Sequence, residues 1–394
     1  MTRDYDVVVL GASGFTGGLT ADHLAARAPA GLRWAVAGRR RSALEEMSAE
    51  RWGGVPVVEA DTTDAASLAA LAASTRVLVT TVGPYLRHGE PVVAACAEAG
   101  TDYVDLTGEP EFVDRVYLAH HETARRTGAR IVHACGFDSV PHDLGVYHAL
   151  RELAGGVDGF GGGLQEPVRV RGVVRTNATF SGGTFHSALG QVSRPRQVRE
   201  AHRARRRVEP RPQGRRVRAV AGRPGRDPLL GYWLLPLPTI DPAVVVRSAA
   251  ALPAYGPDVT YSHYAGTRTL RYAAGGVAGV AALLVAAQVG PLRRRLEQRV
   301  PSGAGPSERR RERSWFSVDV VAETPTRIVH TRVLGGDPGY TETARMLGES
   351  ALCLALDDNP PSAGSVTTAA AMGEALLARL QAVGLRFEVV ARSS

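Results

Sequence analysis

Near its N-terminus the chain runs from a short apolar strand through a glycine-rich turn into a helix, an arrangement that leaves few folds open. Residues 7–17 read VVVLGASGFTG. Gly11 permits a tight strand-to-helix turn, Gly14 lets the backbone approach a pyrophosphate, and Gly17 lets the helix lie close to the sheet. The helix expected over 15–28 would aim free N–H groups and the positive end of its dipole at the phosphates. The pattern predicts a dinucleotide site.

The residues after the second predicted strand distinguish the two common dinucleotides. That strand spans 33–37 and ends in Gly38-Arg39-Arg40. A preference for NAD would place Asp or Glu here to accept from the ribose 2′-OH, whereas arginines pair with a 2′-phosphate. The sequence therefore predicts NADP(H) as the cofactor. The alternative is a glycine-rich turn without a ligand, which the strand, helix and arginines around it disfavour.

Strand and helix patterns alternate through the first third of the chain, as in a doubly wound parallel sheet. Ligands of such sheets bind at the carboxyl ends of the strands. The predicted strands cover 7–10, 33–37, 56–59, 76–81, 102–105 and 130–133. We expect an α/β fold with an N-terminal Rossmann domain over residues 1–145.

After the Rossmann domain the pattern changes to that of a second α/β domain, expected over 146–365. Alternation of apolar and polar residues over part of its length predicts a strand at 168–176, and strand-like runs lie at 315–323 and 327–334; together they predict a mixed or antiparallel sheet. Residues 366–394 are expected to form a C-terminal helix that packs back on the sheets. A chain of 394 residues exceeds the size at which one core keeps growing, which agrees with two domains.

The chain contains no lysine, so all 47 of its basic residues are arginine. A Schiff-base lysine, a phosphate-loop lysine and the Tyr-x-x-x-Lys pair of short-chain dehydrogenases are therefore excluded. Thirteen of the arginines stand against two glutamates in a basic insert, residues 194–226. Because the formal net charge of the whole chain is only +8, the remainder is slightly acidic.

The basic insert is interrupted by four prolines and has no aromatic residue on which a base could stack. We therefore expect no nucleic-acid partner. A solvated arginine-rich loop is the first interpretation of the insert. Contact with an anionic membrane surface or an acidic carrier partner is the second.

Composition also bears on compartment and metal binding. Cys96, Cys135 and Cys353 are far apart, with no Cys-x-x-Cys spacing, so neither a zinc site nor a disulfide framework is indicated, and no metal is expected. A polar N-terminus leads directly into a strand, which indicates no signal peptide and a cytoplasmic protein.

Residues 273–290 form an uncharged run rich in alanine and glycine, only weakly hydrophobic for its length. Its interpretations are buried core, peripheral membrane contact and a span, in that order.

Polar or turn-forming residues follow four of the predicted strands, at the edge where ligands should bind. Asp61 follows the third strand, where it could meet the adenine or cap a helix. Residues 82–85 follow the fourth, and their turn can pass beside the nicotinamide ribose while Tyr85 presents its hydroxyl. After the fifth strand, Glu109 could bind a ribose or substrate, or lie at a helix N-terminus. Residues 135–145, CGFDSVPHDLG, follow the sixth strand.

The order of these motifs resembles that of the saccharopine dehydrogenase-like superfamily and, more narrowly, of its bacterial trans-acting enoyl reductase branch. The resemblance covers nearly the whole chain. It is carried by Gly11-x-x-Gly14-x-x-Gly17, Ala37-Gly38-Arg39, Val82-Gly83-Pro84-Tyr85, Gly108-Glu109, residues 135–141, Ser181 to Thr184, Gly305-Pro306-Ser307 before Trp315-Phe316, and Thr367 to Gly373. It implies an NADP-binding domain, a second α/β domain over the nicotinamide, and reduction of an enoyl double bond in a polyketide-type acyl chain held on a synthase. The basic insert is longer and more basic than the family pattern.

Enoyl reduction needs hydride delivery to the β-carbon, polarisation of the thioester carbonyl and a proton for the α-carbon. Since lysine is absent, we expect Tyr85 as the proton donor, with His142 as a second catalytic candidate. The predicted substrate contacts are Asp138, Ser139 and Thr184. The predicted cofactor-binding residues are Gly11, Ser13, Gly14, Phe15, Thr16, Gly17, Arg39, Arg40, Asp61, Val82, Gly83, Pro84, Gly136 and Phe137.

Two other functions stay open at this point. A saccharopine-type amino-acid or imine dehydrogenase would need paired charges for the α-amino and α-carboxylate groups, and Arg171, Arg175 and Asp241 could provide them. A non-catalytic NADP-binding protein at a membrane is the other alternative. The expected partners are an acyl substrate, free or carrier-bound, and a polyketide synthase or a membrane surface. A homodimer is compatible with the sequence.

Overall fold

The structure is a computed structural model that describes residues 3–156, 160–178, 194–271, 275, 279 and 305–393. Its first sheet has seven parallel strands in the order β14-β6-β5-β4-β1-β2-β3. The strands are β1 (Tyr5–Leu10), β2 (Trp34–Gly38), β3 (Val57–Glu59), β4 (Thr75–Thr80), β5 (Asp102–Asp105), β6 (Arg130–Val132) and β14 (Gly364–Val366). This sheet confirms the predicted doubly wound Rossmann fold.

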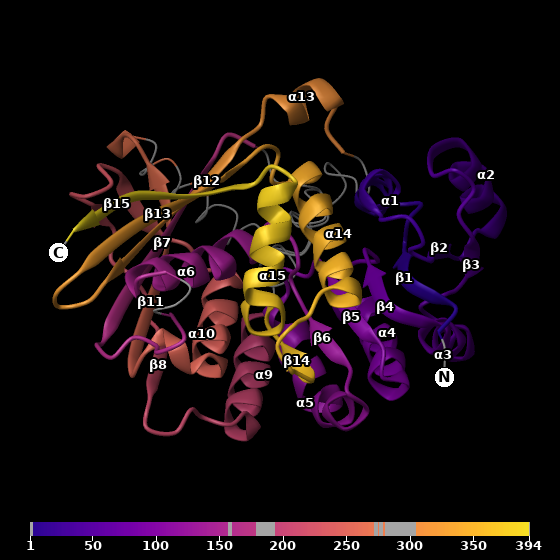
Figure 1. Ribbon diagram of the computed structural model, residues 1–394, viewed down its shortest axis with the longest axis horizontal. Helices are drawn as coiled ribbons and strands as arrows, with labels where there is room; N and C mark the ends of the chain where they lie inside the picture. The colour runs from indigo at the N-terminus through magenta and orange to yellow at the C-terminus, as the bar shows by residue number, and fades with distance from the viewer. Residues whose placement is uncertain are drawn as a thin grey trace.

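Helices cover both faces of this sheet, which explains the uninterrupted apolar run of β1 (Figure 1). Alternate residues of a strand point to opposite faces: Val7 and Val9 join one buried cluster, while Val8 and Leu10 join another. The helices that connect these strands are α1 (Phe15–Arg27), α2 (Arg41–Arg51), α3 (Ala65–Ser74), α4 (Tyr85–Ala99) and α5 (Pro110–Thr127).

The second sheet has eight strands and mixed directions, the first of the two forms in the prediction of a mixed or antiparallel sheet. β7 pairs with β11 in parallel and with β12 antiparallel. The strands are β7 (Val168–Thr176), β8 (Arg216–Ala219), β9 (Gly225–Arg226), β10 (Trp233–Pro236), β11 (Asp258–Thr267), β12 (Phe316–Glu323), β13 (Ile328–Gly335) and β15 (Arg386–Ser393). The remaining helices are α6 (Val140–Leu153), α9 (Pro195–Val208), α10 (Asp241–Ala251), the 3-10 turn η1 (Pro253–Tyr255), α13 (Glu308–Glu312), α14 (Thr341–Leu356) and α15 (Thr368–Ala382).

The chain returns to the first sheet late, and this differs from the predicted division at 146–365. Helix α14 packs on α1, and β14 adds a strand beside β6. A strand of three residues, Gly364–Val366, is too short to show alternation, so the sequence pattern did not reveal it. The final segment, expected as a helix over 366–394, forms α15 and then β15, which pairs with β13.

The basic insert also differs from its first interpretation as a loop. Residues 195–208 form the regular helix α9, with Pro195 in its first turn. A proline is tolerated there because the missing N–H would have no partner within the helix. The remainder of the insert contributes the short strands β8 and β9.

The weakly hydrophobic run at 273–290 lies outside the described residues, apart from positions 275 and 279. Among the helices that the structure describes, none combines the length and hydropathy needed to cross a bilayer.

A buried carboxylate links the two halves of the molecule. Asp143, in the first turn of α6, is fully buried. Its Oδ2 accepts hydrogen bonds from the Thr368 hydroxyl at 2.7 Å and from the Ala369 N–H at 2.8 Å, both at the start of α15. Burial raises the pKa of this carboxyl, and the donors around it act in the opposite direction. The contact fixes α15 between the sheets (Figure 1).

Thr368→Val should lower the free energy of unfolding by about 2 kcal/mol, because it keeps the side-chain shape but removes a donor from a buried carboxylate. Urea denaturation measures the change. Thr326→Val, at an exposed turn, is the matched control and should stay within about 0.5 kcal/mol of the wild type. An equal loss in the two variants would show that the Asp143 contact has no special weight.

Candidate functional site

The three glycines of the first turn form a close-packed cradle. Gly11 has φ +92° and donates its N–H to the Ala37 carbonyl at 2.9 Å. A Cβ on Gly17 would lie 2.2 Å from the Gly11 carbonyl oxygen, so no other residue fits there without moving the helix. Gly14 donates to the same carbonyl at 2.9 Å. The turn and the helix are thus held against each other by backbone contact alone.

The N-terminus of α1 is open to an anion. Gly14 precedes the helix and has no side chain to cap it, and the first turn carries no acidic residue. Ser13 and Gly14 are exposed, and Phe15 and Thr16 are half-buried. Free N–H groups and the helix dipole favour negative charge at such an end. The geometry therefore fits a dinucleotide pyrophosphate.

The turn after β4 forms one wall of this cradle. A Cβ on Gly11 would lie 2.8 Å from a methyl of Val82, and the Thr81 hydroxyl donates to the Gly11 carbonyl at 3.2 Å. Gly83 and Pro84, joined by a cis peptide bond, are exposed beside it. The predicted cofactor residues after β1 and β4 thus lie together.

Arg39 and Arg40 follow the end of β2 and are exposed. Neither forms an ion pair within the described part of the chain. Asp61, beyond β3, accepts from the Thr63 N–H and hydroxyl, each at 2.9 Å. Those bonds lower the pKa of Asp61, and the charge of Arg39 contributes to the shift. The helix cap is Asp64 rather than Asp61, and two arginine side chains remain available for a phosphate.

A segment of the second domain covers the same cradle, which the sequence did not reveal. The Phe15 ring meets Tyr340 edge-on with centroids 4.9 Å apart, and the Arg311 guanidinium lies 5.5 Å from the Phe15 centroid. Gly305 is also packed against Phe15. Arg311 donates to the Thr341 hydroxyl at 3.1 Å, while its buried Nε has no hydrogen-bond partner in the described residues. Arg311 is therefore a candidate phosphate contact, hidden in sequence by its arginine-rich surroundings.

Tyr85, the predicted proton donor, is buried below the edge of the sheet. Its hydroxyl donates to the Thr80 carbonyl at 3.1 Å and accepts from the Leu106 N–H at 3.2 Å. Burial raises the pKa of this phenol well above its usual value, as does the neighbouring Asp105 charge. Both hydrogen-bonding roles of the hydroxyl are occupied, so the geometry favours a structural role.

Glu109 stands at the start of α5 but acts on α4. Its two carboxylate oxygens accept from the Tyr85 N–H at 3.1 Å and the Leu86 N–H at 2.9 Å. The carboxylate thereby satisfies the free donors at the N-terminus of α4. Glu109 also stands at the N-terminus of α5, the place that one of the sequence alternatives gives it.

The loop after β6 lies between the two sheets. A Cβ on Gly136 would lie 2.7 Å from Leu106, and the Phe137 ring packs on Phe316 of β12 with centroids 4.8 Å apart. Ser139 precedes α6 and is fully buried, and its hydroxyl has no hydrogen-bond partner among the described residues. Thr184, the other predicted substrate contact, lies outside the described residues.

Four titratable groups meet behind this loop. Nδ1 of His142 lies 2.7 Å from Oδ1 of Asp241, and Nε2 of His263 lies 3.6 Å from the other oxygen. All three side chains are buried, and they come from α6, α10 and β11. Asp138 is half-buried, and its carboxyl lies close to Gly108 at the end of β5.

Burial sets the protonation of this group. Burial, reinforced by the Asp241 charge, raises the pKa of Asp138 to about 7. Burial would also raise the pKa of Asp241, but attraction to His142 and His263 outweighs it and lowers that pKa. Burial lowers the pKa of His263 to about 4, so its ring is neutral at pH 7. One ionised carboxylate therefore stands beside a carboxyl that is half protonated at neutral pH.

His142, Asp241 and His263 also bring ligand atoms within 4.8 Å of one another, which raises the question of a metal ion. Two ligands of a tetrahedral zinc ion, each at about 2.0 Å, stand about 3.3 Å apart. The 2.7 Å between His142 Nδ1 and Asp241 Oδ1 is shorter than that, and neither atom makes a hydrogen bond within the described residues. We therefore interpret the cluster as a buried group of close titratable side chains rather than as a zinc site.

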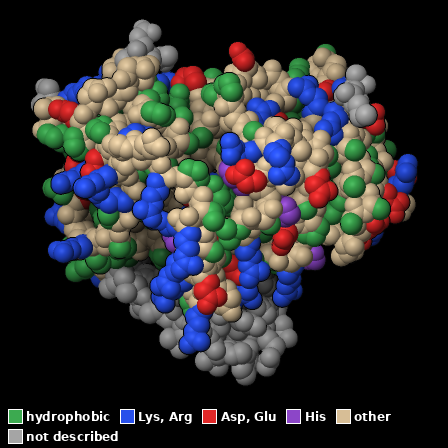
Figure 2. Space-filling view, turned by 90° about the horizontal axis from the view of Figure 1, so that it is seen from below, with side chains coloured by type: hydrophobic (Ala, Val, Ile, Leu, Met, Phe, Trp, Pro, Cys, Tyr) green, Lys and Arg blue, Asp and Glu red, His purple; other side chains and the backbone are tan. Residues whose placement is uncertain are grey.

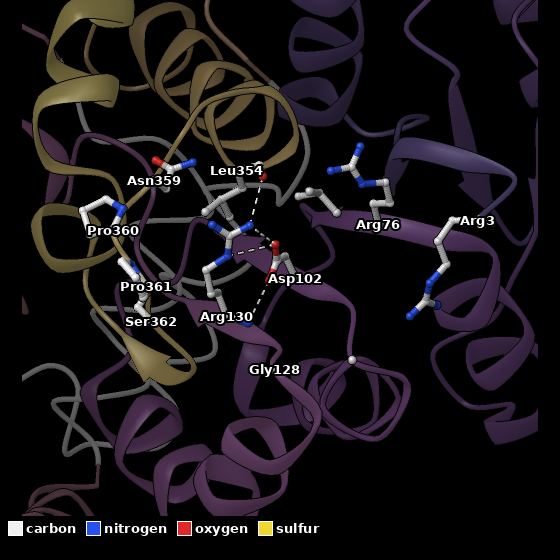
Figure 3. A pocket seen from close by; sticks show the side chains of 12 residues that line it. Arg3, Arg76, Asp102, Gly128, Arg130, Leu354, Asn359, Pro360, Pro361 and Ser362 are labelled. Atoms are coloured by element: carbon white, nitrogen blue, oxygen red, sulfur yellow. Dashed lines mark hydrogen bonds and ion pairs between the residues drawn. The ribbon is translucent and has the colours of Figure 1, made fainter. Parts of the chain in front are cut away.

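A hollow of about 310 Å³ lies at the opposite edge of the first sheet, where β4, β5 and β6 begin (Figure 3). Its cations already have partners. Arg130 pairs with Asp102 and donates to the Leu354 carbonyl at 2.9 Å, and Arg3 donates to the Ala72 carbonyl at 2.7 Å. The hollow is a structural polar junction, remote from the glycine cradle.

Fold and site together define an NADP-dependent oxidoreductase. Residues 7–132 match the saccharopine dehydrogenase NADP binding domain family. The whole fold is similar to that of apo saccharopine dehydrogenase (L-Glu forming) from Saccharomyces cerevisiae, with a TM-score of 0.57 at 13% identity over 98% of this chain and 100% of that one.

Full-length relatives narrow the class. The chain is 37% identical to a trans-acting enoyl reductase of Mycobacterium ulcerans (strain Agy99), over 97% of each chain. It is 41% identical to a Mycobacterium tuberculosis (strain H37Rv) protein to which the same activity is provisionally assigned. That alignment covers 100% of this chain and 99% of the relative. The chain belongs to this family of enoyl reductases.

Arg39→Ala should weaken NADPH binding by roughly 30-fold, or about 2 kcal/mol, and leave NADH binding nearly unchanged, because only NADPH carries the 2′-phosphate. Fluorescence titration of each nucleotide measures the two dissociation constants. Arg27→Ala, an exposed arginine at the far end of α1, is the control. Equal losses for the two nucleotides would refute the assignment of Arg39.

Arg311→Ala should weaken NADPH and NADH by a similar factor, about tenfold, because the pyrophosphate is common to both. The same titrations measure it. A loss confined to NADPH would instead place Arg311 at the 2′-phosphate.

Proposed function

We propose that this protein reduces the enoyl double bond of an acyl thioester with NADPH, and that the acyl chain is presented by a polyketide synthase. The names of its full-length relatives support the reaction. The observation in the structure that carries the proposal is Asp138, a carboxyl with a pKa of about 7 on the loop after β6. Nicotinamide rings approach this edge of a Rossmann sheet.

NADPH bound at Gly11 to Gly17, with its 2′-phosphate at Arg39, would supply the hydride for the β-carbon. The reaction also needs a proton at the α-carbon, and Asp138 is the group that we assign to give it. A general acid works best when its pKa lies near the working pH. Asp138 meets that condition because burial and the neighbouring Asp241 charge disfavour its ionised form.

The other predicted donors are less suited. The Tyr85 hydroxyl is occupied on both sides, by Thr80 and Leu106. His142 is 2% exposed and turns its Nδ1 toward Asp241. We therefore give Asp241 a positioning role: its negative charge reinforces the burial that raises the pKa of Asp138 and so helps to keep that proton available at pH 7, whereas His142 acts on this pKa in the opposite direction.

Apolar packing beside Asp138 supports an apolar acyl chain. The half-buried Phe137 ring, on the loop that carries Asp138, packs on the buried Phe316 of β12 with centroids 4.8 Å apart. The arginines that an amino-acid substrate would need already have contacts within the protein. Arg171 lies 2.8 Å from Asp227 and also pairs with Glu323, and Arg175 donates to the Tyr232 hydroxyl at 2.7 Å. This arrangement favours an enoyl thioester over an amino or imino acid.

NADPH oxidation against short and long trans-2-enoyl thioesters, beside 2-oxo acids with amines, tests the function. Turnover of the thioesters alone is expected. Turnover of the 2-oxo acids with amines would identify an amino-acid dehydrogenase, and tight NADPH binding without any turnover would identify a non-catalytic NADP-binding protein.

Wild-type kcat should fall as the pH rises through about 7, because the acid must be protonated to act and loses its proton above its pKa. Asp138→Asn should lower kcat by about 100-fold and remove that limb of the pH profile. Steady-state kinetics between about pH 5.5 and 9 measure both. Asp358→Asn, at an exposed carboxylate, is the control and should keep the wild-type profile. If kcat of Asp138→Asn still falls above about pH 7 as in the wild type, another group supplies the proton.

A further inference from the structure

Helix α9 divides its arginines between two faces. The helix packs on α5 along one side. Arg205, which points inward, is 3% exposed and pairs with Asp114 and Glu209. Glu209 in turn lies 2.9 Å from Arg247 of α10. These ion pairs, of which Arg205–Asp114 is buried, hold the helix in one orientation on the body of the protein.

The outward face of α9 carries a row of arginines without carboxylate partners. Arg199, Arg203 and Arg207 recur every four residues and therefore lie on one side of the helix. They are exposed and form no ion pair within the described ranges of the chain. The outward row consists of Arg196, Arg199, Arg203, Arg206 and Arg207. Glu200 is the one acidic residue within α9. The row is a fixed positive surface on a regular helix, which a solvated loop would not provide.

The row begins near the edge that carries the proposed site. Arg194, which precedes α9, lies 2.9 Å from the buried carboxylate of Glu111 in the first turn of α5. The helix α5 follows β5, and the carboxyl end of β5 belongs to the ligand edge of the first sheet. Figure 2 views the molecule from the end where α9 and α5 lie in Figure 1, and blue arginine side chains gather in bands on this face.

The composition of this face distinguishes the kinds of anionic partner. The arginine row has no aromatic side chain to stack on bases. Its one exposed aliphatic side chain is Val208 at the last turn, too little to insert into a bilayer. A protein surface rich in Asp and Glu needs neither feature, since complementary charge on two folded surfaces is sufficient to steer and orient them.

We propose that the outward arginine row of α9 is the docking surface for an acidic acyl carrier domain, which delivers the enoyl chain to the site at the sheet edge. This rests on the proposed function and specifies the partner of that site. Docking here would leave the arm of the carrier to reach the ligand edge past Glu111. The arginine row would speed the encounter with the carrier domain and orient it, and would not affect the chemical step.

Charge reversal tests the surface. The variant Arg199→Glu, Arg203→Glu, Arg207→Glu is compared with Arg27→Glu, Arg126→Glu, Arg386→Glu, which makes the same change of charge at exposed arginines on other elements. Each is assayed with a trans-2-butenoyl group on a purified acidic acyl carrier protein and, separately, on N-acetylcysteamine. For the α9 variant, kcat/KM with the carrier should fall by about tenfold or more, while kcat/KM with N-acetylcysteamine and the NADPH dissociation constant stay at wild-type values.

Salt provides a second readout. For the wild type, kcat/KM with the carrier should fall as ionic strength rises from about 0.05 to 0.3 M, and the α9 variant should lose most of that dependence. An α9 variant that keeps wild-type kcat/KM with the carrier would overturn the proposal. If that variant also no longer sediments with phosphatidylserine vesicles that bind the wild type, the surface serves a membrane instead.

Failure of the proposed function would be distinguishable. If neither thioester is turned over, the enoyl reductase assignment fails, and direct binding of the acidic carrier protein to the wild type and the two variants by biolayer interferometry still tests the surface. Weaker binding of the α9 variant alone supports docking, and equal binding of all three proteins overturns it.

Discussion

The contact between Gly17 and the Gly11 carbonyl is the constraint on which the rest of the site depends. A Cβ at position 17 would lie 2.2 Å from that oxygen, so helix and turn meet only through glycine. The contact places the N-terminus of α1 at the carboxyl edge of the sheet and leaves its donors open to an anion. It also presents Phe15 to the second domain, where Tyr340, Gly305 and Arg311 lie against the ring. One backbone contact therefore helps to position the cofactor cradle and its cover.

The chemistry that we propose at the loop after β6 depends on the burial of charged groups. A reductase without lysine needs another acid, and the structure brings Asp138, His142, Asp241 and His263 together from three separated stretches of chain. Of the two aspartates, Asp241 keeps its charge because attraction to His142 and His263 outweighs its burial, and Asp138 keeps a proton because of its burial, reinforced by the nearby Asp241 charge. The pair would give the site a proton near neutral pH without a lysine or a metal ion.

Arginine has two uses in this chain, and burial separates them. Arg205 and Arg194 hold α9 on α5 through carboxylates that are themselves buried, whereas Arg199 and its neighbours face solvent. A buried unpaired charge would be strongly destabilising, so the inward arginines have partners. An exposed arginine needs none, which leaves the outward row available to a partner molecule.

By itself the sequence determined the local features: the glycine cradle, the arginines after β2, the strands from β1 to β6 and strands β7, β12 and β13 in the second sheet. These depend on spacing of two to four residues, on turn chemistry and on charge, all of which a linear pattern contains. Only the tertiary structure decided that Tyr85 is occupied, that Arg311 covers the pyrophosphate cradle, that Asp241 and His263 stand behind Asp138, and that α9 is a clamped helix. Burial and contacts between separate elements set these properties, and neither is written in local periodicity. The separations along the chain run from 21 residues for Tyr85 and Leu106 and 83 residues for Arg194 and Glu111 to about 300 for Arg311 and Phe15.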